Sequence, residues 1–353
     1  MTDVGVAPGR VNLIGEHTDY NGGFVLPTVL PQQTRCEVVP RSDQVVHALS
    51  AQITEAADAT YTIDAEQRLD AWIDYVQGVT WALQRAGIAL RGFNLSVQSD
   101  VPIGKGLSSS ASLEVAILRA LRSAFDFRLS DEEMALVAHN AETGFVGAPV
   151  GIMDQMACSL GRARYALFLD TRTRRYDHIP IPDSLEIGVI DSGIAHHHAT
   201  GSYQIRRHEC DEAAAQLGVD LLCDLKPEDL GRAARLPDPL NRRVRHVVTE
   251  NHRVLAAVDA MKKRDTATLG TLFRESHASM RDDFEVSLPE IDQLVAIADR
   301  QPGVLGARLT GGGFGGAVVM LCTSGSLRSA AEEIVQRYRS STHCDGSVLL
   351  PRN

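Results

Sequence analysis

The chain has 353 residues, of which 44% are apolar and 23% are charged, with a formal net charge of -10. This is the composition of a soluble globular protein, long enough for two domains. Nucleic acids and anionic membranes bind basic surfaces, so the acidic balance argues against either as the main partner. The N-terminus lacks a signal peptide pattern, and the six cysteines are scattered without a CxxC pair. We therefore expect a cytoplasmic protein.

The first half of the chain changes from strand patterns to helix patterns at about residue 110. Apolar, β-rich stretches at 23–30, 34–40 and 92–102 are broken by Pro and Gly and predict strands. From Ser110 the apolar residues recur every three or four positions, which predicts a helix to about residue 125. Ser130 followed by Glu133 forms a capping box that opens a second helix, through about Glu142.

The second half alternates long helices with a few strands. Strands are predicted at 165–173 and 185–193, where we place the crossover between two domains, 1–165 and 166–353. Helices are predicted at 203–217, 242–263, 267–283 and 290–301, and the last strands lie near 307–312 and 316–322. The alternation is too irregular for a doubly wound sheet, so the expected class is a two-domain α/β (α+β) protein.

The loop 104–112, GKGLSSSAS, stands between a predicted strand and a predicted helix. A helix N-terminus carries unpaired N–H groups and a partial positive charge, which suits phosphates, and glycines allow close approach of the backbone. The loop matches neither the Walker pattern nor the Rossmann pattern. The alternative is an ordinary Gly/Ser-rich turn with an N-cap.

Two further segments gather polar groups beside glycines. The segment 9–23, GRVNLIGEHTDYNGG, brings Arg10, Glu16, His17 and Asp19 together, as a polyhydroxylated ligand would require, or else forms a solvated polar turn. In GIMDQ, Asp154 stands among apolar residues, where desolvation favours the role of a base; a simple helix cap is the alternative. The glycine-rich segment 309–320 is a tight loop packed against either backbone or a ligand.

Together these segments resemble the GHMP kinase superfamily and, within it, the galactokinases. GRVNLIGEHTDYNGGFVLP is similar to the galactokinase signature, PIGKGLSSSASLEVA to the ATP-binding motif, and GARLTGGGFGGAVVML to the third motif. VGAPVGIMDQMACSLG, SYQIRRHEC and ESHASMRDDFEVSLPEIDQL also resemble galactokinase segments. The resemblance runs in order over some nine tenths of the chain.

The resemblance implies a sugar-1-kinase that transfers the γ-phosphate of MgATP to the C1 hydroxyl of galactose. It implies Asp154 as catalytic base with Arg10 beside it, and Mg²⁺ held by Ser110 and Glu142. Sugar-binding residues would be Glu16 near O6, Asp19 near O3 and O4, His17, Gly151 and Tyr203. The phosphates would be bound by the loop residues Gly104, Lys105, Gly106, Leu107, Ser108, Ser109 and Ser110.

The resemblance also implies a fold. The N-terminal domain would be like ribosomal protein S5 and the C-terminal domain ferredoxin-like, with the active site between them. The implied partners are a sugar and ATP, without nucleic acid or membrane, in a monomer or weak oligomer.

Two departures concern specificity. Lys105 occupies a loop position that is usually small, where it adds charge near the phosphates or points to solvent. The run His196-His197-His198 is more basic than usual and edges the sugar pocket or, as an alternative, binds a metal.

Other functions stay open at this point. The sugar could be N-acetylgalactosamine, galacturonate or arabinose; a carboxylate at Glu16 would repel galacturonate, and arabinose would leave Glu16 unpaired. A galactose and ATP sensor without catalysis is a rival from another class, against which the complete catalytic set argues.

Overall fold

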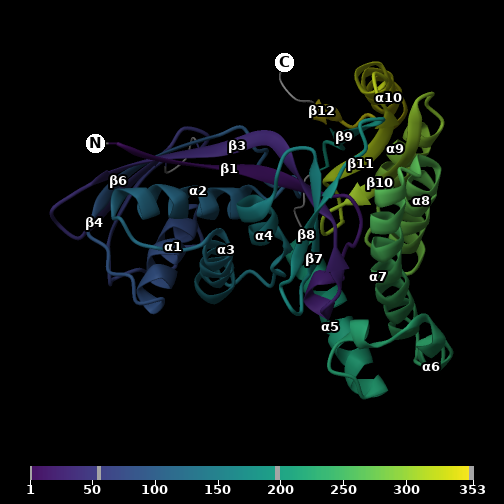
Figure 1. The fold of residues 1–353 in the computed structure, drawn as a ribbon, viewed down its shortest axis with the longest axis horizontal. Coiled ribbons are helices and arrows are strands. Elements are labelled where there is room, and N and C mark those ends of the chain that lie inside the picture. Colours follow the sequence, from purple (N-terminus) through teal and green to yellow (C-terminus); the bar gives the residue numbers. More distant parts are fainter. Residues whose placement is uncertain (1, 54–56, 195–198, 350–353) are drawn as a thin grey trace. The chain divides into compact units, whose positions relative to one another are not determined.

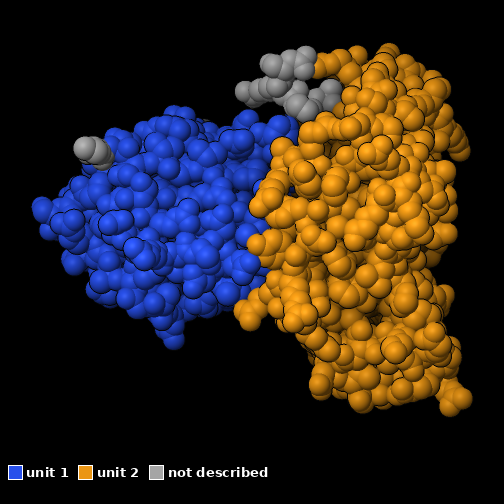
Figure 2. Space-filling model, in the orientation of Figure 1, with its two compact units in different colours: residues 1–10, 29–103, 107–161 blue, residues 11–28, 104–106, 162–353 orange. Residues whose placement is uncertain are grey.

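The computed structural model describes residues 2–53, 57–194 and 199–349. The chain forms two compact units, which Figure 2 shows in different colours. Unit 1 comprises residues 1–10, 29–103 and 107–161, and unit 2 comprises residues 11–28, 104–106 and 162–353. The predicted domain division at residue 165 stays a prediction. In the described residues no helix is long and apolar enough to cross a membrane.

Unit 1 packs helices against a sheet (Figure 1). Its strands are β1 (Asp3–Asn12), β3 (Pro27–Pro40), β4 (Val45–Ser50), β5 (Asp58–Thr62) and β6 (Phe93–Ser99). Strand β3 pairs with β1 and β6, while β4 runs parallel to β6 and antiparallel to β5. The last residues of β1 and the first of β3 belong to unit 2, so the chain passes from one unit to the other within these strands.

The helices of unit 1 are α1 (Ile73–Arg85), α2 (Ser109–Ala124), α3 (Asp131–Asn140) and α4 (Met153–Leu160), with a π-helical turn at Ala141–Val146. Helix α2 buries Val115, Ile117, Leu118 and Leu121 in the core of the unit. The predicted capping box is confirmed: the Ser130 hydroxyl accepts a hydrogen bond from the Glu133 backbone N–H, and the Glu133 carboxylate accepts one from the Ser130 N–H.

Unit 2 contains an antiparallel sheet in the order β10-β11-β9-β12. These strands are β9 (Leu185–Asp191), β10 (Val304–Thr310), β11 (Ala317–Thr323) and β12 (Ser347–Leu349). Strands β2 (Phe24–Val25), β7 (Tyr165–Asp170) and β8 (Tyr176–Pro180) also belong to this unit, with β7 paired to the other two.

Helices contact the antiparallel sheet and one another in unit 2 (Figure 1). They are α5 (Ala199–Leu217), α6 (Leu230–Ala233), α7 (Leu240–Lys263), α8 (Thr266–Asp282), α9 (Pro289–Asp299) and α10 (Leu327–Thr342). Helices α8 and α9 pack on β10, α10 packs on β9, and α7 lies beside α8. The mixed α/β class is therefore confirmed. The elements that were not predicted are helices α1, α4, α6 and α10 and strands β1, β4, β5, β8 and β12.

Candidate functional site

Asp154 lies in the first turn of α4 and forms a bidentate ion pair with Arg10 of β1. The Arg10 Nε and Nη2 atoms donate to Oδ1 at 2.8 and 2.6 Å, and Nη2 also lies 2.6 Å from Oδ2. The Arg10 side chain is only 5% exposed, whereas that of Asp154 is 23% exposed. A buried guanidinium thus holds a carboxylate that solvent reaches.

The loop before α2 brings a third donor to this carboxylate. The Ser108 hydroxyl donates to Asp154 Oδ2 at 2.6 Å. Ser108 adopts a left-handed conformation with φ of 60° and precedes the first turn of α2. The Arg10 N–H donates to the Leu107 carbonyl at 3.2 Å, which ties the loop to β1. Unit 1 therefore assembles Arg10, Ser108 and Asp154 from three segments far apart in the chain.

Glu142 is a second carboxylate of this cluster, placed by the π-helical turn after α3. It is 5% exposed, and its Oε2 accepts a hydrogen bond from Gln155 Nε2 at 2.6 Å. Burial raises its pKa to about 7, and the hydrogen bond from the Ser110 hydroxyl and the charge of Arg10 act in the opposite direction. A cation bound here would favour the ionised carboxylate.

Ser110 and Glu142 fit a Mg²⁺ ion by their chemistry. Both offer oxygen ligands, and a nucleotide-bound Mg²⁺ takes only one or two protein ligands. In the described part of the chain, no group of three or more His, Cys, Asp or Glu side chains is arranged to hold a metal. A two-ligand site completed by phosphates and water is therefore the kind of metal site that this cluster can provide.

Glu114 was not identified from the sequence. It is fully buried on α2, and neither carboxyl oxygen has a hydrogen-bond partner with good geometry among the described residues. Burial raises its pKa well above the usual range, and the neighbouring charges of Glu142 and Asp154 add to this effect. A glutamate on the apolar face of LEVAILRAL was the signal in the sequence that would have indicated it.

Unit 2 contains the other polar residues of the signature, and Glu16 is the most strongly held of them. Its Oε2 accepts from Asn12 Nδ2 at 2.8 Å and from Arg308 Nη2 at 2.6 Å. Its Oε1 accepts from the Thr310 hydroxyl at 3.1 Å and from the Gly311 N–H at 2.9 Å. Since protein donors satisfy Glu16, a sugar without a C6 group would not leave this carboxylate unpaired, contrary to our argument against arabinose.

His17 lies in an aromatic cluster with Tyr20, Tyr203 and Phe284. Its Nδ1 is 2.8 Å from the Tyr20 hydroxyl, and its ring centroid lies 5.4 Å from that of Tyr203 and 4.6 Å from that of Phe284. Burial lowers the pKa of His17 to about 3, so the imidazole is neutral. Its buried Nε2 has no hydrogen-bond partner within good geometry in the described residues.

Asp19 begins the short 3-10 helix Asp19–Asn21 and follows His17 in the same turn. Its carbonyl accepts a hydrogen bond from the Thr171 hydroxyl at 2.9 Å. Tyr203 lies on α5, and its ring meets that of Tyr20 edge to face at 5.5 Å. Unit 2 therefore brings His17, Asp19 and Tyr203 into one cluster of polar and aromatic side chains.

The predicted site residues divide between the two units as follows. Unit 1 contains Arg10, Leu107, Ser108, Ser109, Ser110, Glu142, Gly151 and Asp154, whereas unit 2 contains Glu16, His17, Asp19, Gly104, Lys105, Gly106 and Tyr203. The run His196-His197-His198 lies outside the described residues, so its predicted position at the sugar pocket and the alternative of a metal site both stay predictions.

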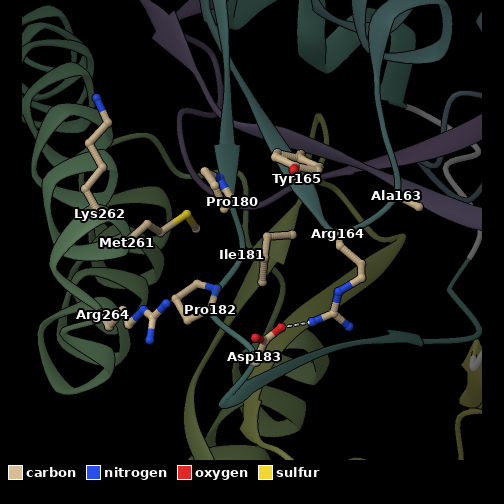
Figure 3. Close-up of a pocket in the computed structure, with 10 residues that line it drawn as sticks. All are labelled: Ala163, Arg164, Tyr165, Pro180, Ile181, Pro182, Asp183, Met261, Lys262 and Arg264. Atoms are coloured by element: carbon tan, nitrogen blue, oxygen red, sulfur yellow. Dashed lines mark hydrogen bonds and ion pairs between the residues drawn. The ribbon is translucent and has the colours of Figure 1, made fainter.

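A surface pocket in unit 2 contains none of these residues (Figure 3). It lies between α7, β8 and the ends of the adjoining loops, and its lining includes Arg164, Asp183, Lys262 and Arg264. Arg164 and Asp183 form an ion pair with each other across the pocket. The pocket is therefore separate from every motif that carries the chemistry.

Family models match three parts of the chain. The galactokinase galactose-binding signature matches residues 3–40, the GHMP kinases N terminal domain matches residues 74–162, and the GHMP kinases C terminal domain matches residues 257–340. The order of these matches is that of the motifs in the sequence, and they include both units.

Relatives that match nearly the full length of this chain are also galactokinases. The galactokinase of Roseiflexus sp. (strain RS-1) is 44% identical, with 98% of this chain and 90% of the relative covered. The galactokinase of Thermotoga neapolitana (strain ATCC 49049 / DSM 4359 / NBRC 107923 / NS-E) is 40% identical, with 94% and 93% covered. A galactokinase of Lactococcus lactis, solved as a complex with galactose, matches at a TM-score of 0.94 and 31% identity, covering 98% of this chain and 92% of that one.

The mevalonate kinase of Methanococcus jannaschii matches at a TM-score of 0.71 but only 16% identity, and so shares the fold alone. The relatives from Roseiflexus, Chloroflexus aggregans and Thermotoga neapolitana, which match over nearly the whole chain at 40–44% identity, are galactokinases. The chain therefore belongs to the galactokinase family of the GHMP kinases.

Proposed function

We propose that this enzyme transfers the γ-phosphate of MgATP to the C1 hydroxyl of galactose and releases ADP and α-galactose 1-phosphate. The observation that carries the proposal is the Arg10–Asp154 pair, held at 2.6 Å and reachable by solvent through Asp154, in a chain of the galactokinase family. Phosphoryl transfer depends mainly on the position of the nucleophile and on neutralising charge, and this pair supplies both.

In the proposed step, the sugar O1 attacks the γ-phosphorus while the bond to the bridging β,γ-oxygen breaks. The proton on O1 passes to Asp154, and the electron pair of the broken bond leaves with ADP. Ser108 and Arg10 both donate to the carboxylate, so they fix its direction toward the hydroxyl. Arg10 also places a positive charge beside the group on which negative charge develops.

Ser110 and Glu142 would hold Mg²⁺, which when bound would neutralise negative charge on the phosphates. The first turn of α2 supplies N–H groups without intrahelical acceptors, and Gly104 and Gly106, both at positive φ, let the backbone of the loop approach phosphates. We assign the nucleotide phosphates to the loop from Gly104 to Ser110 on these grounds.

For the sugar we propose Glu16, His17, Asp19, Gly151 and Tyr203. His17 is buried and neutral, and a neutral imidazole can donate a hydrogen bond to a sugar hydroxyl or accept one from it. A contact of Glu16 with O6 would have to replace one of the four donors that already bind this carboxylate. A neutral histidine and two carboxylates suit an uncharged sugar rather than an acidic one.

The related 1-kinases for N-acetylgalactosamine, galacturonate and arabinose remain the alternatives. The residues that would contact C2 are not among the motifs, and the satisfied Glu16 no longer argues against a pentose. A sensor without catalysis is disfavoured by the assembled Arg10, Ser108, Glu142 and Asp154. We propose further that the enzyme works in the cytoplasm as a monomer or weak oligomer, without nucleic acid or membrane partners.

The test is ADP release by the purified protein with MgATP across galactose, N-acetylgalactosamine, galacturonate, arabinose, glucose and mannose. Turnover with galactose well above every other sugar is the expected result. A preference for another sugar would change the assigned sugar substrate but would leave the proposed kinase mechanism in place. No turnover with any sugar, together with saturable binding of galactose, would favour the sensor.

A further inference from the structure

Lys105 lies in the predicted phosphate loop and makes an ion pair within unit 2. Its Nζ is 3.1 Å from Asp191 Oδ2, and the two side chains are 23% and 11% exposed. Lys105 stands between Gly104 and Gly106, whose φ angles of 71° and 70° are typical of glycine. The ammonium therefore projects from a loop whose backbone is built for close approach to a ligand.

Asp191 is the fixed partner of this pair. It is the last residue of β9, where it is in register with Ala317 of β11 on one side and Ser347 of β12 on the other. Its Oδ1 accepts a hydrogen bond from the Gly193 N–H at 2.9 Å, so the carboxylate is oriented by its own turn. Lys105, in contrast, carries its charge on a flexible four-carbon chain.

The two oxygens of Asp191 have different roles as a result. Oδ1 is bound locally, whereas Oδ2 faces Lys105. The phosphates of a nucleotide carry several negative charges and would attract a nearby ammonium more strongly than one carboxylate does.

We propose that Asp191 competes with the nucleotide phosphates for the ammonium of Lys105. This inference rests on the proposed function, because it takes the loop from Gly104 to Ser110 as the phosphate site. Lys105 exchanges its partner when a nucleotide binds, and Asp191, without touching the nucleotide, acts as a positioning residue that lowers affinity for the phosphates and so aids the release of ADP.

A purely structural ion pair would behave differently, and the difference lies in the sign of the effects. If the pair only tied the loop to β9, removing either partner would loosen the same loop, and both changes would weaken nucleotide binding. Under competition, removing Lys105 weakens binding, whereas removing the charge of Asp191 frees Lys105 and strengthens it. The two mechanisms thus predict opposite results for one of the two substitutions.

The experiment is calorimetric titration of the full chain with MgADP, with MgATP and, as a control without phosphates, with adenosine, all without sugar. Lys105→Met should weaken MgADP binding by about tenfold and leave adenosine binding unchanged. Asp191→Asn keeps the Oδ1 acceptor for Gly193 and should strengthen MgADP binding several-fold. The double variant should match Lys105→Met, since Asp191 acts only through Lys105.

Weaker MgADP binding by Asp191→Asn, or an equal effect on adenosine, would overturn the competition. If Asp191→Asn did not fold, Lys105→Arg would replace it. MgADP affinity that is retained in Lys105→Arg but lost in Lys105→Met supports a contact between residue 105 and the phosphates. Equal losses of affinity in the two variants contradict such a contact. A wild-type chain that binds no nucleotide would refute the proposed function itself. Nucleotide affinity that does not change when Lys105 is replaced would refute only this inference.

Discussion

The buried glutamates Glu142 and Glu114 of unit 1 and the buried glutamates Glu16 and Glu250 of unit 2 have very different surroundings. In unit 2, four donors bind Glu16, and Glu250 accepts from the Gly15 N–H, the Ser276 hydroxyl and Arg253. In unit 1, Glu142 has Gln155 and Ser110, while Glu114 has no partner with good geometry in the described residues. The protein supplies several donors to Glu16 and Glu250, whereas Glu142 and Glu114 share the amide of Gln155, and a cation beside them would favour their ionised forms.

The largest effect is expected at Asp154, which is paired with Arg10 and reachable by solvent. Asp154→Ala should lower kcat by a factor on the order of 10²–10⁴, the usual contribution of a positioned acid or base. Galactose binding, measured by calorimetry, should be largely retained. Full turnover by this variant would contradict the assignment of Asp154.

Breaking the buried pair of unit 2 should be costly for stability. Arg308→Met leaves Glu16 buried without its guanidinium, so we expect the free energy of unfolding to fall by about 3–5 kcal/mol in urea denaturation. The double variant Arg308→Met with Glu16→Gln should recover part of the loss, because no charge is then left unpaired. A double variant as unstable as the sum of the single variants would show that the two side chains do not act as a pair.

One buried group in each unit, Glu142 in unit 1 and His246 in unit 2, should give pH dependences of opposite sign. Glu142 in unit 1 has its pKa raised from 4.5 to about 7, so the folded state binds its proton more tightly than the unfolded state. Its contribution to the free energy of unfolding therefore falls as pH rises from about 4.5 to about 7, by about 3 kcal/mol. Both tryptophans, Trp72 and Trp81, lie in unit 1. Their fluorescence in urea titrations at several pH values therefore measures the free energy of unfolding of this unit in wild type and in Glu142→Gln. If the free energy of unfolding depended on pH in the same way in wild type and variant, the raised pKa of Glu142 would be contradicted.

His246 of α7 should give the opposite slope in unit 2. It is buried between Ser279 and the Glu16 carbonyl, at 2.9 and 3.1 Å, and burial lowers its pKa from 6.5 to about 4. Its stabilising contribution is present above pH 6.5 and is lost as pH falls toward 4, by about 3 kcal/mol. Hydrogen exchange of α7 peptides, corrected for intrinsic rates, should show this loss in wild type and a smaller one in His246→Gln. Equal losses would mean that His246 does not control the slope.

The smallest effect is expected from neutralising Glu114. Glu114→Gln keeps the shape of a side chain whose pKa burial raises well above its usual range, so the free energy of unfolding should change by less than about 1 kcal/mol. The matched change in unit 2, Glu16→Gln, removes a charged acceptor from Arg308 and should cost about 1.5–3 kcal/mol. Equal losses in the two variants would remove the distinction between the units.

Much of the fold could be predicted from local pattern. Helices α2, α3, α7, α8 and α9 and strands β6, β9 and β11 lie within a few residues of their predicted positions, because each carries an apolar periodicity. Helix α1 was missed although Ile73, Val76, Val79 and Leu83 have helical spacing, since valine, threonine and Gly78 lower its helix propensity. Strand β1 was not predicted, because Pro8 and Gly9 interrupt its β-rich pattern.

The site was predicted less from pattern than from resemblance. Arg10 and Asp154 are 144 positions apart, and Glu16 and Arg308 are 292 positions apart, so no spacing rule could join them. Glu114 and Asp191 escaped notice because a single acidic residue within an apolar segment reads as surface until its burial is known. The fold alone reveals which carboxylates are satisfied and which are not.

The path of the chain through β1 and β3 has a consequence for dissecting this enzyme. The chain changes unit after residues 10, 28, 103, 106 and 161, so no single cut yields both units intact. A fragment from residue 162 onward would retain Arg308 but lose Glu16, Asn12 and Lys105. It would expose the hydrophobic surface under residues 11–28 and leave a buried guanidinium without its carboxylate. Truncation alone would therefore not allow separate expression of the second half. Residues 11–28 would first have to be grafted onto it.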